Sequence, residues 1–133
     1  MAEKTIMVVD DDDDIRQLME QVFHRAGYRV VLAESAEEAE EILEKETISV
    51  YFLDLHLPGM NGLELCRKIR KSMPMAIIHA VTGYSSLFEL SECREAGFDD
   101  YFHKPVKLSK LVKAAEIAFE KHDRWKGKQN ASS

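Results

Sequence analysis

The chain has 133 residues, a formal net charge of −6 at pH 7, 45% hydrophobic residues and 32% charged residues. This length suits one domain with a single core, and the composition is that of an ordinary soluble globular protein. The acidic balance argues against direct nucleic-acid binding, which needs a basic patch. Because no apolar run approaches about 20 residues and no signal peptide is present, we expect a cytoplasmic protein that does not contact membranes.

The first part of the chain alternates between short apolar runs and segments with helical spacing. Thr5–Val9 is predicted to be a buried strand, and it ends at five consecutive aspartates. An apolar stripe at helical spacing follows, made of Ile15, Leu18, Met19, Val22 and Phe23. After Gly27, a second strand is expected at Tyr28–Ala33, and a capping box of Ser35 and Glu38 opens a second helix.

The same alternation continues to the end of the chain. Three further strands are expected at Ile48–Leu53, Met75–Val81 and Tyr101–His103. Pro74 and Gly97 are expected to end the third and fourth helices, and Ser86 with Glu89 forms a second capping box. The last helix has an apolar side made of Leu108, Leu111, Val112, Ala115, Ala118 and Phe119. Beyond Lys126 the chain is polar and aperiodic, which predicts a frayed tail.

Strands that are apolar throughout and are each followed by a helix predict an α/β fold, with a parallel sheet covered on both sides. We expect one domain over residues 1–121. Residues 122–133 are expected to be an extension of the last helix followed by a disordered tail or a truncated linker. In such open sheets, ligands bind beyond the carboxyl ends of the strands, where the strand order reverses. The candidate functional residues should therefore lie at strand ends.

Polar residues do follow the predicted strands at those ends. They are Asp10, Asp11, Asp54, Thr82 and Lys104. In a strand order 2-1-3-4-5 the first and third strands are neighbours, so the three carboxylates would converge and raise one another's pKa. A divalent cation such as Mg²⁺ would relieve this repulsion. Phosphoryl transfer requires this set of groups: a carboxylate nucleophile, a metal ion, a second cation and a hydroxyl donor.

Four sequence segments at these strand ends resemble the response-regulator receiver family of two-component signal transduction, and the chemotaxis regulators in particular. They are IMVVDDD, FLDLHLPGMNGLEL, AVTGYS and YFHKP, in this order, and the resemblance covers residues 4 to about 121. It implies a flavodoxin-like (βα)5 doubly wound fold with a parallel sheet in the order 2-1-3-4-5. It also implies a phosphoprotein switch rather than an enzyme, with Mg²⁺-dependent self-phosphorylation from a phosphodonor and slow self-dephosphorylation only.

The resemblance assigns a role to each acidic residue of the candidate site. Asp54 would be the phosphoacceptor. Asp11 and Asp54 would bind Mg²⁺ directly, while Asp10 would act largely through water. The backbone carbonyl of His56 would be a further metal ligand.

The resemblance also implies a switch and a set of partners. Thr82 would bind the phosphoryl group as the switch hydroxyl, Lys104 would supply the second positive charge, and Tyr101 would move inward on activation. Pro105 resembles the family's cis proline, and only X–Pro bonds adopt cis at low cost. A histidine kinase or phosphotransfer protein would donate the phosphoryl group. An effector or a second copy of the chain would bind the face made by the fourth helix, fifth strand and fifth helix, with Leu87, Phe88, Asp100 and Lys110 as candidates.

Two bulky residues border the approach of water to Asp54 in this family. They are His56 and Tyr84, two positions beyond Asp54 and Thr82 respectively. Bulky side chains there favour slow self-dephosphorylation. We therefore predict a long-lived phosphorylated state.

Other polar and aromatic residues have structural interpretations. We expect Asp13 or Asp14 to cap the first helix, and Asp12 to be solvated only. His79 is expected to be a hydrogen-bonded, partly buried histidine rather than a metal ligand. Trp125 would serve either as a docking contact or as part of a frayed tail. The isolated cysteines, Cys66 and Cys93, are expected to be buried apolar side chains, and Asn61 is given no functional role.

Two other functions are compatible with parts of the pattern. A haloacid-dehalogenase-type phosphatase also forms an aspartyl phosphate, and Asp99 and Asp100 superficially supply its acidic pair. That pair precedes Lys104, which is the wrong order, and the chain has no room for a substrate-selecting cap. A degenerate receiver that binds partners without phosphorylation would usually lack one of the five site residues, and all five are present here.

Overall fold

The computed structural model describes residues 4–83 and 86–131, in which strands and helices alternate along the whole chain. The elements are β1 (Thr5–Val9), α1 (Asp13–Arg25), β2 (Arg29–Ala33), α2 (Ala36–Leu43), β3 (Val50–Leu53), α3 (Gly62–Ser72), β4 (Ile77–Thr82), α4 (Leu87–Ala96), β5 (Asp100–His103) and α5 (Leu108–Ala131). The predicted alternation is confirmed, with boundaries that differ by two residues or fewer at the strand ends. Tyr84 and the side chain of Phe88 lie outside the described residues.

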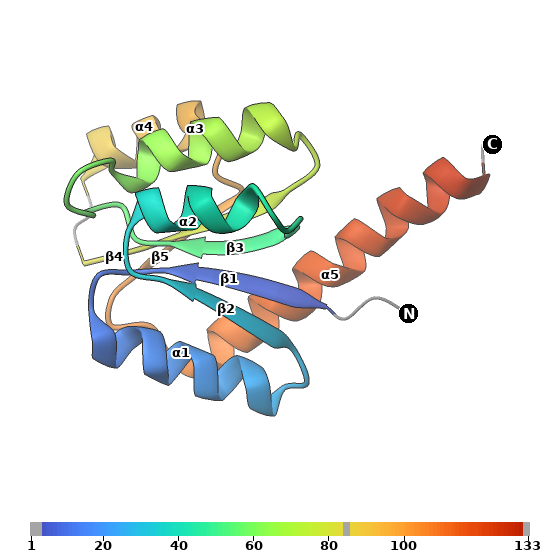
Figure 1. Cartoon of the computed structure of the whole chain (residues 1–133), viewed down its shortest axis with the longest axis horizontal. Coiled ribbons are helices and arrows are strands. Elements are labelled where there is room, and N and C mark those ends of the chain that lie inside the picture. Colours follow the sequence, from blue (N-terminus) through green and yellow to red (C-terminus); the bar gives the residue numbers. More distant parts are fainter. Residues whose placement is uncertain (1–3, 84–85, 132–133) are drawn as a thin grey trace.

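The described strands form one parallel sheet in the order β2-β1-β3-β4-β5, as predicted. β3 is the central strand, paired with β1 on one side and with β4 on the other. The chain builds outward from β1 to β2 and then returns to add β3 on the other side of β1. The reversal of strand order therefore lies between β1 and β3, whose carboxyl ends are adjacent (Figure 1).

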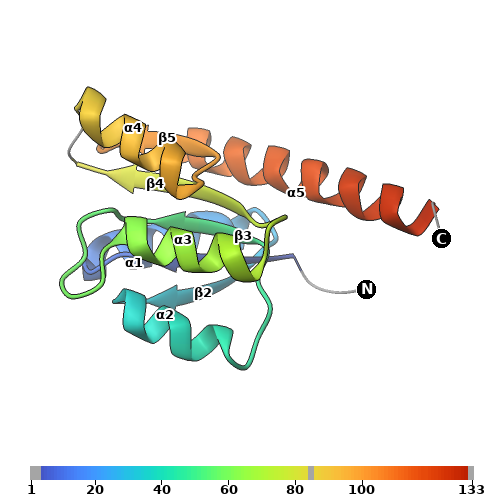
Figure 2. The same ribbon diagram turned by 90° about the horizontal axis from the view of Figure 1, so that it is seen from above.

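Helices cover both faces of the sheet, with α1 and α5 on one side and α2, α3 and α4 on the other (Figures 1 and 2). Alternate residues of each strand serve the two faces. Val50 and Phe52 pack with α1 and α5, whereas Tyr51 and Leu53 pack with α2 and α3. Burial on both faces explains why the strands appear in the sequence as continuous apolar runs.

The first helix begins one or two residues earlier in the aspartate run than we predicted. Asp12 is the N-cap, in an extended conformation, and its carboxylate accepts hydrogen bonds from the backbone N–H groups of Asp14 and Ile15. The assignment of this role to Asp13 or Asp14 is wrong, and so is that of Asp12 as solvated only. A capping carboxylate must stand before the first helical residue to reach the free N–H groups.

The other predicted helix ends are confirmed. Ser35 Oγ accepts a hydrogen bond from the N–H of Glu38 at the start of α2, and Ser86 Oγ accepts one from Glu89 at the start of α4. Gly97 ends α4 in the left-handed region, with φ of 104°, which glycine adopts without strain.

Two expectations about the helices are wrong: one concerns the buried side of α1 and the other concerns where α5 ends. Leu18 was placed on the buried stripe of α1, but 48% of its surface is exposed. The tail expected beyond Lys126 continues as helix to Ala131, and α5 projects beyond the sheet (Figure 1). Trp125 lies on the projecting part of α5. Within the described residues, no helix combines the length and apolarity required to traverse a bilayer.

His79 is almost completely buried, rather than partly buried as predicted. Its Nδ1–H donates to the backbone carbonyl of Tyr51 over 2.8 Å, and its ring stacks on Phe52 with 4.2 Å between ring centroids. Burial lowers the pKa of His79, so the neutral form is favoured in the core. Cys66 and Cys93 are buried free thiols, as predicted.

Candidate functional site

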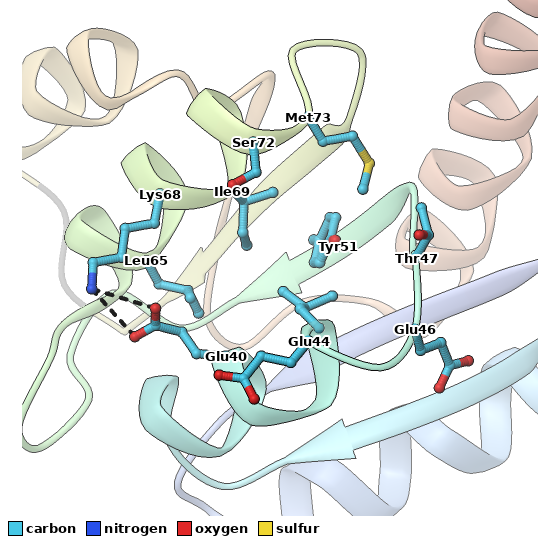
Figure 3. Close-up of a pocket in the computed structure, with 11 residues that line it drawn as sticks. Glu40, Glu44, Glu46, Thr47, Tyr51, Leu65, Lys68, Ile69, Ser72 and Met73 are labelled. Atoms are coloured by element: carbon cyan, nitrogen blue, oxygen red, sulfur yellow. Dashed lines mark hydrogen bonds and ion pairs between the residues drawn. The ribbon is translucent and has the colours of Figure 1, made fainter.

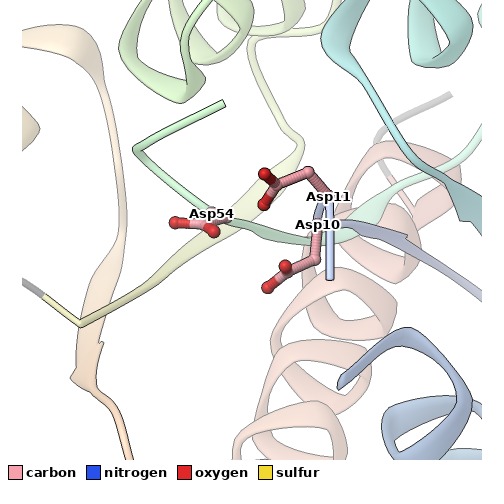
Figure 4. A group of neighbouring side chains, drawn as sticks. All are labelled: Asp10, Asp11 and Asp54. Carbon is pink, nitrogen blue, oxygen red and sulfur yellow. The ribbon is translucent and has the colours of Figure 1, made fainter. Parts of the chain in front are cut away.

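Three carboxylates meet at the carboxyl edge of the sheet, at the reversal of strand order (Figure 4). Asp10 and Asp11 directly follow β1, and Asp54 directly follows β3. Each offers one oxygen, and these oxygens all lie within 4.8 Å of one another. Asp10 and Asp54 are buried, whereas Asp11 is exposed. The convergence predicted from the strand order is confirmed, and Asp11 leaves the cluster open toward solvent.

Lys104 brings an ammonium group to two of these carboxylates. Its Nζ donates to Asp10 Oδ2 over 2.9 Å and to Asp54 Oδ2 over 3.3 Å. Its backbone N–H donates to the carbonyl of Thr82 over 2.8 Å, which joins the ends of β4 and β5. The peptide bond between Lys104 and Pro105 is cis, as predicted. The end of β5 therefore delivers its cation directly to the acidic cluster.

Charge at the site is only partly balanced within the protein. Burial raises the pKa of Asp10, more than its hydrogen bonds from Lys104 and from the Asp12 N–H lower it. Burial lowers the pKa of Lys104, but the hydrogen bond to Asp10 and the charges of Asp10 and Asp54 outweigh it and raise that pKa. One ammonium group faces three carboxylates, so a negative excess remains. Three carboxylate oxygens at this spacing fit a hard divalent cation such as Mg²⁺.

Backbone contacts that the sequence did not reveal orient the two buried carboxylates. Asp10 Oδ1 accepts from the N–H of Asp12 over 2.9 Å, and Asp54 Oδ1 accepts from the N–H of His56 over 3.1 Å. The Arg16 guanidinium donates to the backbone carbonyl of Asp10 over 2.7 Å. In each carboxylate one oxygen is held by the backbone while the other faces Lys104.

Gly62 allows the start of α3 to pack directly against the backbone of Asp54. A Cβ at Gly62 would lie 2.1 Å from the Asp54 carbonyl oxygen, and the Gly62 N–H donates to the carbonyl of Leu55 over 3.0 Å. The preceding residue, Asn61, caps α3 by accepting from the N–H of Glu64 over 2.9 Å. Asn61 therefore has a structural role that we did not predict, and Gly62 is a positioning residue for Asp54.

The two expected switch residues lie on neighbouring strands. Thr82 is the last residue of β4 and is fully buried. Tyr101 on β5 is half-buried and packs beside Leu55, Ala80 and Cys93, on the face covered by α4. Both residues belong to the same side of the sheet, because Tyr101 pairs with Ala80, two residues before Thr82. Their movement on activation stays a prediction.

His56 links the loop after β3 to helix α4. Its side chain is 53% exposed, in line with the expectation that it faces solvent, and its Nε2 lies 3.2 Å from Glu89 Oε1. This contact was not expected from the sequence. Tyr84, the other residue expected to border the approach of water, lies outside the described residues.

The acidic pair required by the phosphatase alternative lies away from the carboxylate cluster. Asp100 begins β5, whose opposite end carries Lys104, so the pair belongs to the amino edge of the parallel sheet. Asp99 accepts hydrogen bonds from Arg70 and from the N–H of Ile78, each over 2.8 Å. Asp99 therefore stabilises the fold, and this alternative loses its acidic pair.

The fold and the site agree with the sequence profile that this chain matches. Residues 6–116 match the response regulator receiver domain, so the chain belongs to that family and is a receiver domain of a two-component response regulator. Receiver domains generally use Mg²⁺ at their acidic phosphorylation site and receive phosphoryl groups from histidine kinases. The position of the Asp10, Asp11 and Asp54 cluster fits that site.

Individual relatives are similar over most of this chain. It is 38% identical over 107 residues to a cyclic di-GMP phosphodiesterase of Thermotoga maritima, covering 80% of this chain and 28% of that protein. It is also 38% identical over 106 residues to the uncharacterized transcriptional regulatory protein YrkP of Bacillus subtilis, covering 80% of this chain and 45% of YrkP. The chain thus spans less than half the length of these relatives.

A solved structure supports the same fold along nearly the whole chain. The CheY-like response regulator receiver domain protein of Methanospirillum hungatei superimposes with a TM-score of 0.86 at 35% identity. The match covers 92% of this chain and 99% of that one. The flavodoxin-like fold implied by the sequence is therefore confirmed.

Proposed function

We propose that Asp54 is the residue that accepts the phosphoryl group, and that Lys104 and Thr82 assist the transfer. The observation that carries this proposal is the pair of hydrogen bonds from Lys104 Nζ to Asp10 and Asp54 at the open edge of the sheet. Asp54 is central in the cluster because it ends β3, the strand between β1 and β4. Asp11 is exposed to solvent, so a phosphodonor can approach the carboxylate cluster from that side.

Asp10, Asp11, Asp54 and the backbone carbonyl of His56 would hold Mg²⁺. When bound, the ion neutralises negative charge on the carboxylates and on the incoming phosphoryl oxygens. Among these residues, Asp10 and Asp54 are already oriented by backbone N–H groups and by Lys104. The site therefore needs little rearrangement to present its oxygens.

Transfer from a phosphohistidine requires one bond to form and one to break. A carboxylate oxygen of Asp54 attacks phosphorus, the bond between phosphorus and the donor imidazole nitrogen breaks, and that nitrogen keeps the electron pair. Lys104 stabilises the phosphoryl charge, and the Thr82 hydroxyl donates to a phosphoryl oxygen. Hydrolysis of the acyl phosphate would be slow because His56 borders the site, and His56→Asn would accelerate it.

A cleft beside Lys104 would seat the donor. It measures about 350 Å³ and is lined mainly by apolar residues of α1, of the β5–α5 connection and of the start of α5, among them Leu18, Pro105 and Leu108. Lys104 lines the cleft and also binds Asp54, so a kinase helix seated there would bring its histidine next to the acceptor. This placement also accounts for the exposure of Leu18.

The signal would leave through the face made by α4, β5 and α5. Engagement of Thr82 by the phosphoryl group would draw its hydroxyl toward Asp54, and Tyr101 would fill the space vacated beside β4. Phosphorylation would shift the population between two states by its differential affinity for them. Leu87, with 87% of its surface exposed, and the exposed Asp100 and Lys110 are available on this face for an effector or a second copy of the chain.

We assign residues 1–121 to the receiver domain, acting in the cytoplasm, and residues 122–133 to a C-terminal segment that begins as an extension of α5 and is followed by a tail or a truncated linker. The domain would act as a switch with no turnover of an external substrate. A coarse test is incubation with acetyl phosphate and Mg²⁺, followed by intact mass measurement. We expect one added phosphoryl group in the native chain and in Asp123→Asn, which alters an exposed carboxylate. EDTA and Asp54→Asn should each prevent the addition, and labelling that survives Asp54→Asn would refute the assignment.

A further inference from the structure

A cavity of about 490 Å³ opens between α2 and α3, at the end of β3 opposite to Asp54 (Figure 3). This volume lies within the range of sites that bind small organic molecules. The cavity exists because α2 ends at Leu43 and the chain crosses to Val50 without helix or strand. The C-terminal half of α3 is therefore left uncovered by α2. None of the residues of the carboxylate cluster lines it.

The floor of the cavity holds a buried hydroxyl group that has no hydrogen-bond partner. Tyr51 is fully buried, and its Oη is the one buried side-chain N or O atom without a partner among the described residues. Figure 3 shows the Tyr51 side chain in the midst of the residues that line the cavity. The surrounding walls are apolar, formed by Leu43, Leu65, Ile69 and Met73. A buried phenol without a partner is unfavourable. Because this oxygen has less than 1 Å² of exposed surface, an acceptor atom that enters from the cavity reaches it only when the side chains that line the cavity move apart.

The rim of the cavity carries excess negative charge. Of its charged lining residues, Glu40, Glu44 and Glu46 are acidic and Lys68 is basic. Lys68 Nζ lies 3.4 Å from both carboxylate oxygens of Glu40, and Arg29 pairs with Glu46. Among the residues that the structure describes, Glu44 forms no ion pair. Its carboxylate therefore remains available to a cationic group above an apolar floor.

We propose that this cavity is a binding site for a small organic cation with an apolar body and a hydrogen-bond acceptor. The acceptor receives the Tyr51 hydroxyl hydrogen, the apolar body packs on Leu65 and Ile69, and the cationic group lies near Glu44. This site is separate from the phosphoacceptor, since the two occupy opposite ends of β3. Its existence does not depend on the role of Asp54.

The experiment uses three probes that differ in one group each. They are 4-methoxybenzylamine, benzylamine, which lacks the acceptor, and 4-methoxybenzyl alcohol, which lacks the charge. Amide NMR titrations of the native chain should give a dissociation constant for 4-methoxybenzylamine in the millimolar range, as expected for a ligand of this size. The shifted amides should lie in residues 43–47 and 65–73. Probes lacking either group should bind more weakly.

Two variants separate the contributions of the protein. Tyr51→Phe keeps the ring and should weaken 4-methoxybenzylamine by about five-fold, because one hydrogen bond is lost, while leaving benzylamine unchanged. Glu44→Gln should weaken both amines by about two-fold and leave the alcohol unchanged. Both variants should still accept a phosphoryl group. Absence of shifts in these segments, or equal binding of 4-methoxybenzylamine by the native chain and Tyr51→Phe, would overturn the proposal.

Discussion

The two ends of β3 differ in whether their buried polar groups have hydrogen-bond partners. At the carboxyl end, both oxygens of Asp54 and of Asp10 have partners in Lys104 or in backbone N–H groups. Toward the amino end, the Tyr51 hydroxyl is fully buried and has no hydrogen-bond partner among the described residues. One strand thus carries a polar cluster held in place by the protein, and a single polar atom that the protein leaves unsatisfied.

This difference teaches which polar groups the fold depends on. At the carboxyl end, removing the Lys104 ammonium group leaves the buried carboxylates of Asp10 and Asp54 without a counter-charge. Their mutual repulsion is then uncompensated, which is strongly unfavourable. Removing the Tyr51 hydroxyl takes away an unsatisfied group and leaves no partner behind, which is neutral or stabilising. The substitutions below test the contrast, in order of decreasing effect.

Replacing Lys104 should have the largest effect. Lys104→Met removes the ammonium group that lies 2.9 Å from Asp10 and 3.3 Å from Asp54. We expect the rate of labelling by acetyl phosphate to fall about 100-fold, the loss typical of a preorganised charge in a reaction site. Lys107→Met, on an exposed lysine three residues later, should label at the native rate. Similar labelling rates for the two variants would show that the carboxylate cluster does not depend on the Lys104 ammonium group, and would contradict the difference drawn between the ends of β3.

Gly62→Ala should distort the carboxyl end through its backbone. The added Cβ would lie 2.1 Å from the Asp54 carbonyl oxygen, so α3 or the end of β3 must move. We expect the free energy of unfolding, measured in urea, to fall by about 1–3 kcal/mol, and labelling to slow. Gly83→Ala is the matched control, because a Cβ there meets nothing within 4 Å. A Gly62→Ala chain as stable and as active as the control would contradict the close packing.

His79, between the two ends on β4, should make stability depend on pH. Burial lowers its pKa from the ordinary value of 6.5, so below that pH the unfolded chain binds a proton that the folded chain does not. The free energy of unfolding should therefore decrease as pH falls below 6.5, by at most about 1.4 kcal/mol per unit until the folded pKa is reached. His79→Leu should remove this component, whereas His103→Gln, on an exposed histidine, should retain it. Equal acid sensitivity in the two variants would mean that His79 is not the cause.

Tyr51→Phe should have the smallest effect, and of opposite sign to most core substitutions. Loss of an unsatisfied hydroxyl should leave the free energy of unfolding unchanged or raise it by up to about 1 kcal/mol. Ser35→Ala removes a hydroxyl that has a partner, the N–H of Glu38 at 3.1 Å, and should lower stability by about 1 kcal/mol. If Tyr51→Phe were as destabilising as Ser35→Ala, the hydroxyl would have a stabilising partner after all.

The sequence was sufficient for those features that depend on local pattern and strand direction. Apolar runs and helical stripes predicted every element, and parallel strands require their carboxyl ends to share an edge. Asp10, Asp11 and Asp54 could therefore be grouped before their coordinates were known. Lys104 joined them because it directly follows β5 at the same edge of the sheet. Its direct hydrogen bonds to Asp10 and Asp54 were not predicted, because β3 and β4 lie between β5 and β1.

Features that depend on the fit between distant segments could not be predicted. The approach of Gly62 to the Asp54 carbonyl requires the position of α3, and a glycine at a helix start does not by itself indicate such contact. Tyr51 belongs to an apolar run, so the pattern predicts burial but not whether its hydroxyl finds a partner. The short α2 that opens the cavity was likewise invisible, since helix periodicity does not specify which neighbouring surface stays uncovered.

The central claim, that Asp54 is the phosphoacceptor, is tested most directly by locating the modified residue. After incubation with acetyl phosphate and Mg²⁺, borohydride reduction converts an aspartyl phosphate into homoserine, which peptide mass spectrometry assigns to one position. We predict homoserine at position 54 and unmodified aspartate at Asp10 and Asp11. Homoserine at either of those positions, or its absence from position 54 in a chain that has gained a phosphoryl group, would contradict the account.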